Sequence, residues 1–268
     1  MLRTALTLRA PARSFALAKL VSRLPSALHP PLRSPLLSRF KQPQNQVRHQ
    51  SSGQGGSASS DTVVLGLVSA NVLVTIGWMK AQTSSARHPT QLPMKLMLTH
   101  FTTSTQHLKE GRYYTLLTAM FSQASLGHLG ANMLGLYFFG REISHVLGPR
   151  RFLGLYLVGG VLSSAAAVLE QHLSGRLTFN LGASGAVNAI TAMSVLLFPH
   201  GTLLLFGIVP MPAWLGGSMF IFKDAYSFAT DKQDGIGHVA HLSGALVGGL
   251  YFYYLRRRAI RNFPFGRF

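Results

Sequence analysis

Three short polar motifs interrupt otherwise apolar stretches of this sequence, and their side chains are of the kinds that carry hydrolytic chemistry. GASGA at 182–186 contains one serine, HVAHLSG at 238–244 contains two histidines, and HLGAN at 128–132 ends in asparagine. A serine becomes a nucleophile when a neighbouring base takes its proton, and imidazole is the usual base near neutral pH. The sequence therefore predicts Ser184 as a nucleophile with a histidine as its general base.

The elements that must position these motifs are six long apolar segments. They lie near the range of roughly 17 to 25 residues that spans a bilayer, and they show almost no polar face at helical period. The segments are 63–79, 126–147, 152–169, 183–198, 202–222 and 236–255. The charged fraction is only 12%. We therefore predict an all-α fold, a polytopic membrane protein with a bundle of six transmembrane helices.

Each motif comes just after the beginning of an even-numbered span, and even-numbered spans run in the same direction across the membrane. The motifs are thus expected to meet at one depth, where ionisable groups are costly and usually functional. His128 and Asn132 are four residues apart on one helix face and are predicted to donate hydrogen bonds to an oxyanion. Asp224 and the other aspartates are assigned to loops or the membrane boundary, so we predict a Ser–His dyad without a carboxylate.

Other interpretations of the same residues remain open. Gly182 with Gly185, and Gly244 with Gly248, have the spacing of small residues that let membrane helices approach closely. Histidines within a membrane also serve as interhelical hydrogen-bond partners or as haem or metal ligands. A small transporter or a haem protein would, however, leave the ordered set of motifs unexplained.

Several classes of protein are excluded by residue types that the sequence lacks. There is no cysteine, which removes thiol proteases, cysteine zinc sites and iron–sulfur clusters. The zinc-protease motif His-Glu-x-x-His does not occur. No metal or organic cofactor is expected.

The formal charge of +18 is concentrated near the N-terminus. Residues 1–60 carry nine Lys and Arg before the first acid at Asp61, and they are rich in Ser, Leu and Ala. This composition is typical of a mitochondrial transit peptide followed by a flexible linker, and a basic tail on acidic lipid is the alternative. No stripe of aromatic residues interleaved with Arg and Lys resembles the base-stacking surface of a nucleic-acid-binding protein. The predicted domains are 1–60, the membrane domain 61–258 and a basic tail 259–268.

Basic residues near the span ends predict the orientation of the bundle. Arg150 and Arg151 lie between spans two and three, and a cluster of arginines follows span six from Arg256 onward. Short loops rich in Lys and Arg remain on the side of the membrane from which the helices are inserted. With a transit peptide in front, both termini are expected in the matrix, and the polar motifs open towards the intermembrane space.

The first loop, residues 80–125, is expected to be more than a linker. Its second half, 113–121, is apolar and aromatic, which predicts a helical excursion into the membrane interface. A seventh full span is the competing interpretation, and it would break the parity of the topology.

Together, the motifs resemble those of the rhomboid intramembrane proteases, of the mitochondrial inner-membrane type. The resemblance covers about 61–258 and rests, in the family's order, on Gly111-Arg112, His128-x-x-x-Asn132, Gly-Ala-Ser184-Gly-Ala, and Ala240-His241-x-x-Gly244 followed by Gly248. Two positions depart from the family, which usually has Trp at Gly111 and often an aromatic residue at Asn188.

The resemblance implies a role for each matched residue. Ser184 would be the nucleophile and His241 its base, because glycines follow His241, but not His238, at three and seven residues. His128, Asn132 and the Ser184 backbone N–H would form the oxyanion hole. The glycines Gly182, Gly185, Gly244 and Gly248 would pack span four against span six, and Arg112 would anchor the first loop. Span five with loop 223–234 would form the substrate gate.

The implied function is endopeptidase cleavage in or next to transmembrane segments of mitochondrial inner-membrane proteins. Its partners would be transmembrane protein substrates and the lipid bilayer, and the sequence does not indicate an oligomeric state. The alternative is a catalytically silent rhomboid-like protein that binds transmembrane segments for quality control. Such relatives usually lose the serine or the histidine, and this chain keeps both.

Overall fold

The computed structural model describes residues 59–87, 92–123, 125–205, 208–230 and 237–262. The predicted transit peptide at 1–60 falls almost wholly outside these residues. The elements, in order, are α2 (Ser60–Arg87), α3 (Leu92–Phe101), α4 (Thr105–Lys109), α5 (Thr115–Thr118), η2 (Ala119–Phe121), α6 (Leu126–Leu147), α7 (Pro149–Ser174), α8 (Ser184–Leu197), β1 (Thr202–Leu205), β2 (Val209–Pro212), α9 (Ala213–Ala229) and α10 (His238–Asn262).

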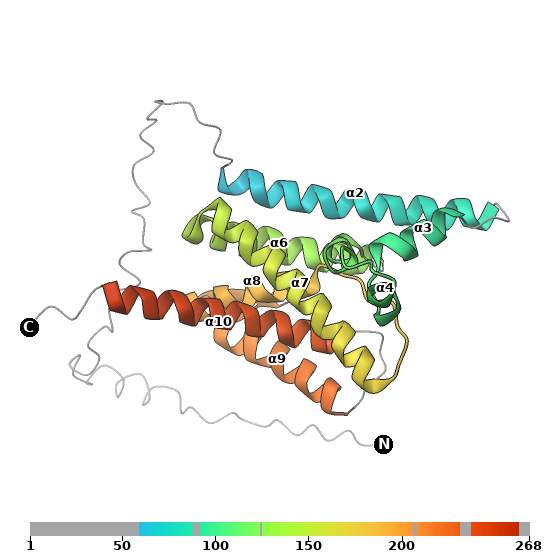
Figure 1. Cartoon of the computed structure of the whole chain (residues 1–268). Coiled ribbons are helices and arrows are strands. Elements are labelled where there is room, and N and C mark those ends of the chain that lie inside the picture. Colours follow the sequence, from blue (N-terminus) through green and yellow to red (C-terminus); the bar gives the residue numbers. More distant parts are fainter. Residues whose placement is uncertain (1–58, 88–91, 124, 206–207, 231–236, 263–268) are drawn as a thin grey trace, which may run out of the picture. The chain divides into compact units, whose positions relative to one another are not determined.

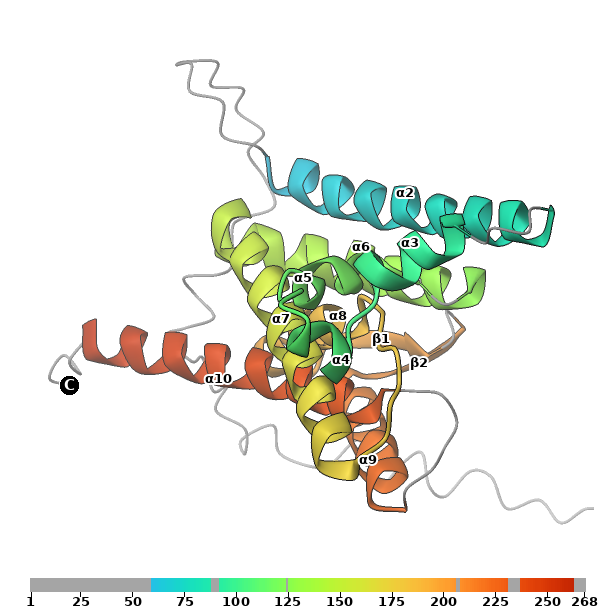
Figure 2. The same ribbon diagram turned by 45° about the vertical axis from the view of Figure 1, so that its right-hand side comes forward.

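Helix α8 is the centre of the helical domain. It packs against α6, α7, α9 and α10, and half of its 14 residues are buried. Figures 1 and 2 show α2 and α10 on opposite sides of the group formed by α6, α7 and α8. The core between these helices contains Leu136 of α6, Tyr156 of α7 and Ile190 of α8, each fully buried. The short helix that begins with Ser184 is thus enclosed by longer ones.

The ends of α6 follow from local chemistry. Its N-cap is Ser125, whose hydroxyl accepts a hydrogen bond from the His128 amide, so the helix begins at Leu126, two residues before His128. At its other end Gly148 has φ +81°, which a glycine adopts without strain, and Pro149 then opens α7. This tight joint reverses the chain between two core helices.

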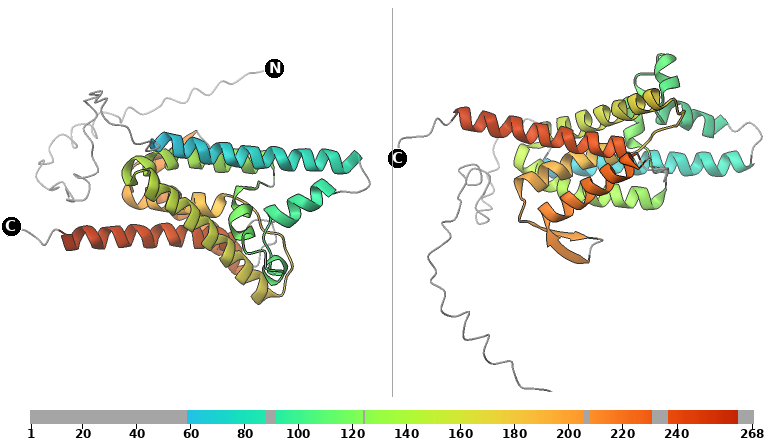
Figure 3. Two further views of the ribbon diagram at one scale, coloured as in Figure 1. Left: turned by 45° about the horizontal axis from the view of Figure 1, so that its top comes forward. Right: turned by 90° about the horizontal axis from the view of Figure 1, so that it is seen from below.

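The prediction of a helical span at 202–222 was wrong for the first half of that range. Residues 202–205 and 209–212 form an antiparallel hairpin, and the helix begins only at Ala213. Pro210 and Pro212 explain the difference, because proline lacks the amide that a helix interior needs. The hairpin lies beside α9, as Figure 3 shows. Helix α9 then continues to Ala229, beyond the predicted end of the span.

The first loop folds into α3, α4, α5 and η2. It is joined to the segment before Ser184 by backbone hydrogen bonds: Thr103 and Asn180 exchange both of theirs at 2.8 Å, and the Gly182 amide donates to Ala119 at 3.0 Å. The 175–183 segment is therefore held against the first loop, which positions the start of α8.

Two helices of the described part are long and apolar enough to cross a membrane, Ser60–Ser84 within α2 and Pro149–Ser174, which is α7. Helix α8 is apolar but shorter. Large apolar side chains also face outwards, among them Leu73, Phe138 and Leu173, which are 68%, 64% and 77% exposed. An outer surface of this kind suits lipid better than water. The count of six spans stays a prediction.

Candidate active site

Ser184 and His241 meet at the interface of α8 and α10. Ser184 is the first residue of α8, and its Oγ lies 2.9 Å from Nε2 of His241, which is in the first turn of α10. The residues are 57 positions apart in the chain, and both are partly buried. This is the distance at which an imidazole can take a hydroxyl proton.

Glycines allow α8 and α10 to approach so closely. A methyl group at Gly244 would lie 2.1 Å from the carbonyl oxygen of Gly185, and one at Gly248 would lie 2.0 Å from that of Ala189. Helix α7 also packs closely here, because a methyl group at Gly185 would lie 2.3 Å from the Cβ atom of Ser163. Only glycine fits at these positions, and the contact fixes His241 opposite Ser184.

The start of α8 provides donors for negative charge. Ser184 lies in the first turn of the helix, where backbone amides have no acceptor within the helix and the helix dipole is positive. Gly182 precedes it with φ +139°, and a methyl group there would lie 3.0 Å from Cε1 of His128 and 3.5 Å from the Ser184 hydroxyl. The His128 ring therefore lies beside the residues that lead into the helix.

Asn132 belongs to a buried chain of hydrogen bonds that the sequence did not reveal. Its Nδ2 donates to Oε1 of Gln123 at 2.8 Å, Gln123 donates to Oδ1 of Asn71 at 2.9 Å, and Asn71 donates to the Tyr156 hydroxyl at 3.0 Å. An amide nitrogen has two hydrogens, so Asn132 retains a second one. Asn132 thus holds α6 to the first loop while it is a candidate oxyanion donor.

A carboxylate reaches His241, contrary to the prediction that none would. Asp224 lies within α9, is only 6% exposed, and places Oδ2 3.2 Å from Nδ1 of His241. Its Oδ1 lies 2.8 Å from Nδ1 of His238, which is 5% exposed. The sequence analysis missed this contact because it ended the fifth apolar segment before Asp224. An acid at the end of an apolar segment was the available signal.

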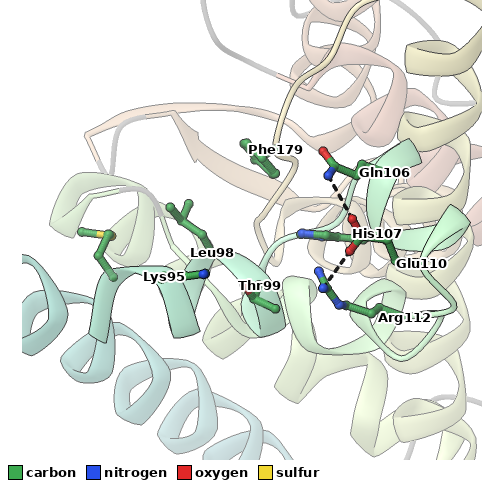
Figure 4. Close-up of a pocket in the computed structure, with 9 residues that line it drawn as sticks. Lys95, Leu98, Thr99, Gln106, His107, Glu110, Arg112 and Phe179 are labelled. Atoms are coloured by element: carbon green, nitrogen blue, oxygen red, sulfur yellow. Dashed lines mark hydrogen bonds and ion pairs between the residues drawn. The ribbon is translucent and has the colours of Figure 1, made fainter. Parts of the chain in front are cut away.

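Arg112 lies away from this cluster, in a cavity of the first loop that Figure 4 shows in close-up. Its Nη2 forms an ion pair of 2.7 Å with Glu110. The residue between them, Gly111, has φ +79° and ends α4 with two hydrogen bonds, Gly111 to Leu108 and Arg112 to His107. This is the helix end that favours glycine, and it explains why a tryptophan would be strained at Gly111.

The fold and the site define a class: a helical membrane protein that presents a serine hydroxyl to a histidine among its packed helices. Residues 110–258, more than half of the chain, match the family described as Rhomboid domain. The chain belongs to the rhomboid family, whose members are generally intramembrane serine proteases.

The chain is also similar to mitochondrial members of this family. RHOMBOID-like protein 12, mitochondrial, of Arabidopsis thaliana is 35% identical over 76% of this chain and 61% of its own length. Presenilin-associated rhomboid-like protein, mitochondrial, of Homo sapiens is 31% identical over 71% and 48%. Rhomboid protein 1, mitochondrial, of Saccharomyces cerevisiae is 32% identical over 53% and 42%. The chain therefore matches about half of the length of these relatives.

Proposed function

We propose that this protein is an intramembrane serine endopeptidase of a mitochondrial membrane, with Ser184 as nucleophile and His241 as general base. The observation that carries the proposal is the 2.9 Å distance between Ser184 Oγ and His241 Nε2. The substrates would be transmembrane proteins, cut in or beside their membrane segments. The membership of the rhomboid family supports both statements.

The chemistry would proceed in two steps. His241 Nε2 takes the hydroxyl proton while Ser184 Oγ attacks the carbonyl carbon, and the oxyanion is stabilised by the Ser184 amide, Asn132 and His128. The tetrahedral species collapses when His241 returns the proton to the leaving amine, which leaves an acyl-enzyme on Ser184. Water, deprotonated by the same histidine, then releases the acyl product.

The remaining proposals concern the placement of this site in the cell. The relatives are mitochondrial and the chain has helices able to span a membrane. We propose the inner membrane, six spans, termini in the matrix and a site that opens to the intermembrane space. The inner-membrane proteins of mitochondria would then supply the substrates.

The proposal is tested by labelling the purified, membrane-reconstituted protein with a fluorophosphonate, which reacts with activated serines. We expect wild type to label, and Ser184→Ala and His241→Ala to lose labelling, because one removes the nucleophile and the other its base. Loss of the base in soluble serine proteases costs about 10⁶-fold in kcat.

Ser243→Ala is the matched control for this experiment. Ser243 lies in the same turn of α10 as His241, but its hydroxyl donates to the backbone oxygen of Ala240. It should label as wild type does. If wild type labels no better than Ser184→Ala in a bilayer that preserves the fold, the chain is a silent rhomboid-like protein, and the proposed function is wrong.

A further inference from the structure

One carboxylate is shared by two histidines where α9 meets α10. Asp224 Oδ1 lies 2.8 Å from His238 and Oδ2 lies 3.2 Å from His241. The Asp224 side chain is 9% exposed, and the only other charged group that contacts it among the described residues is Lys223, at 3.8 Å. A buried charge persists when it is paired and hydrogen-bonded, and here both carboxylate oxygens have a partner.

The carboxylate determines which nitrogen of His241 carries the proton. An ionised carboxylate only accepts hydrogen bonds, so the Nδ1 atom that faces Asp224 must be the N–H donor. In the neutral ring Nε2 then has a free lone pair, and this is the atom that faces the Ser184 hydroxyl at 2.9 Å. The opposite tautomer would point an N–H at the serine and could not take its proton.

We infer that Asp224 is a positioning residue for His241, so that this protein works through a Ser184, His241 and Asp224 triad in which His238 holds the second carboxylate oxygen. The inference rests on the proposed function and deepens it. Asp224 would orient the imidazole, select its tautomer and stabilise the imidazolium that forms when Ser184 is deprotonated. It would not itself take up the proton.

The carboxylate comes from a different helix than the histidine that it orients. Asp224 belongs to α9, whereas His238 and His241 belong to α10. Any movement of α9 away from α10 would therefore separate Asp224 from His241. The base is complete only while α9 is packed against α10, which links the position of this helix to the reactivity of the serine.

The same three side chains also place donor atoms within 4.8 Å of one another, close enough for a metal ion. The two uses exclude each other. A metal on Nδ1 of His241 would force the ring proton onto Nε2 and leave no lone pair for the Ser184 hydroxyl. A triad thus requires that the protein be active without a metal, and this provides a direct test.

The test compares Asp224→Asn, Asp224→Glu and wild type, in reconstituted protein, by rate of fluorophosphonate labelling and by kcat and KM on a transmembrane peptide substrate. Asparagine keeps the shape of aspartate but presents an N–H₂ group that favours the wrong tautomer. The same change costs about 10⁴-fold in kcat in a soluble triad. We expect at least about a 10-fold loss in kcat with little change in KM, partial rescue by glutamate, and a changed pH profile of kcat.

Asp61→Asn is the matched control, because Asp61 is also a carboxylate shared by two basic side chains, Arg141 and His145, but at the first turn of α2. It should label at the wild-type rate. The inference is overturned if Asp224→Asn unfolds at the same temperature as wild type and is labelled at the wild-type rate. Loss of wild-type activity on treatment with EDTA would overturn the inference together with the role of His241 as general base. In the first case wild type still labels and Ser184→Ala does not, so the proposed function would stand.

Discussion

At the scale of single residues, the candidate site combines a serine and a histidine in contact with residues that hold the surrounding structure. Ser184 and His241 are in direct contact, and the predicted site residues Gly182 and Asn132 each have a structural role as well. Gly182 has a backbone conformation that favours glycine and lies against the His128 ring. Substitutions here change structure and chemistry together, so each test needs a neighbour that changes structure alone.

Asn132 and Gln123 form such a pair. Asn132→Ala leaves the buried Gln123 oxygen without its donor, at a cost of about 1 to 3 kcal/mol in stability. It also removes the proposed oxyanion donor, and loss of such a donor costs about 10² to 10³ in rate. Gln123→Ala should cost comparable stability but leave the serine reactive. The measurements are thermal unfolding and the rate of fluorophosphonate labelling, and equal labelling losses in both variants would reduce Asn132 to a structural role.

At the scale of elements, the contact between α8 and α10 decides whether Ser184 and His241 meet. The two helices carry no long-range charge pair among the described residues at this contact. They approach through Gly185, Gly244 and Gly248, where backbone atoms of α8 occupy the space that side chains would need. Close packing of small residues replaces the hydrophobic effect as the source of helix association inside a membrane.

Gly248 and Gly249 are adjacent on α10 and make the packing testable. A methyl group at Gly248 would lie 2.0 Å from the backbone oxygen of Ala189, whereas one at Gly249 meets only the end of Leu196, at 3.8 Å. Gly248→Ala should cost about 1 to 3 kcal/mol from overpacking and slow serine labelling. Gly249→Ala should gain up to about 1 kcal/mol from helix propensity. The measurement is the unfolding temperature of each variant in detergent, and equal shifts for Gly248→Ala and Gly249→Ala would contradict this packing.

At the scale of the whole molecule, the charge distribution predicts how the protein lies in its membrane. Arg150 and Arg151 begin α7, and Arg256, Arg257 and Arg258 lie near the end of α10. Ser184 begins α8 and His241 lies in the first turn of α10, so the site is near the opposite end of α10 from its arginines.

The orientation is checked with a C-terminal epitope tag in mitoplasts, where the outer membrane is opened and the inner membrane is intact. We expect added protease to spare the tag, because short basic segments remain on the matrix side. Lysis of the mitoplasts with detergent should then allow its degradation, which shows that the tag is cleavable. Digestion before lysis would place the C-terminus in the intermembrane space and reverse the proposed topology.

The sequence by itself determined most of the helices and predicted which serine and which histidine would meet. Runs of apolar residues in α2, α6, α7, α8 and α10 are local signals, and the predicted segments overlap these helices. The serine and the histidine could be chosen because each lies in a polar motif inside an apolar run. Hydropathy alone did not separate strand from helix in 202–212, whereas the prolines there indicate that this segment is not a helix.

The carboxylate that faces His241 was decided only by the tertiary structure. Asp224 and His241 are 17 residues apart on different helices, and no local sequence pattern predicts that their side chains meet. From sequence, a charged residue at the end of an apolar run is assigned to the membrane boundary, because an isolated charge is costly at depth. Packing of α9 on α10 supplies two histidine partners and removes that cost. Ser184 and His241 could be picked out from the sequence, but Asp224 comes to lie beside His241 only when the helices are packed together.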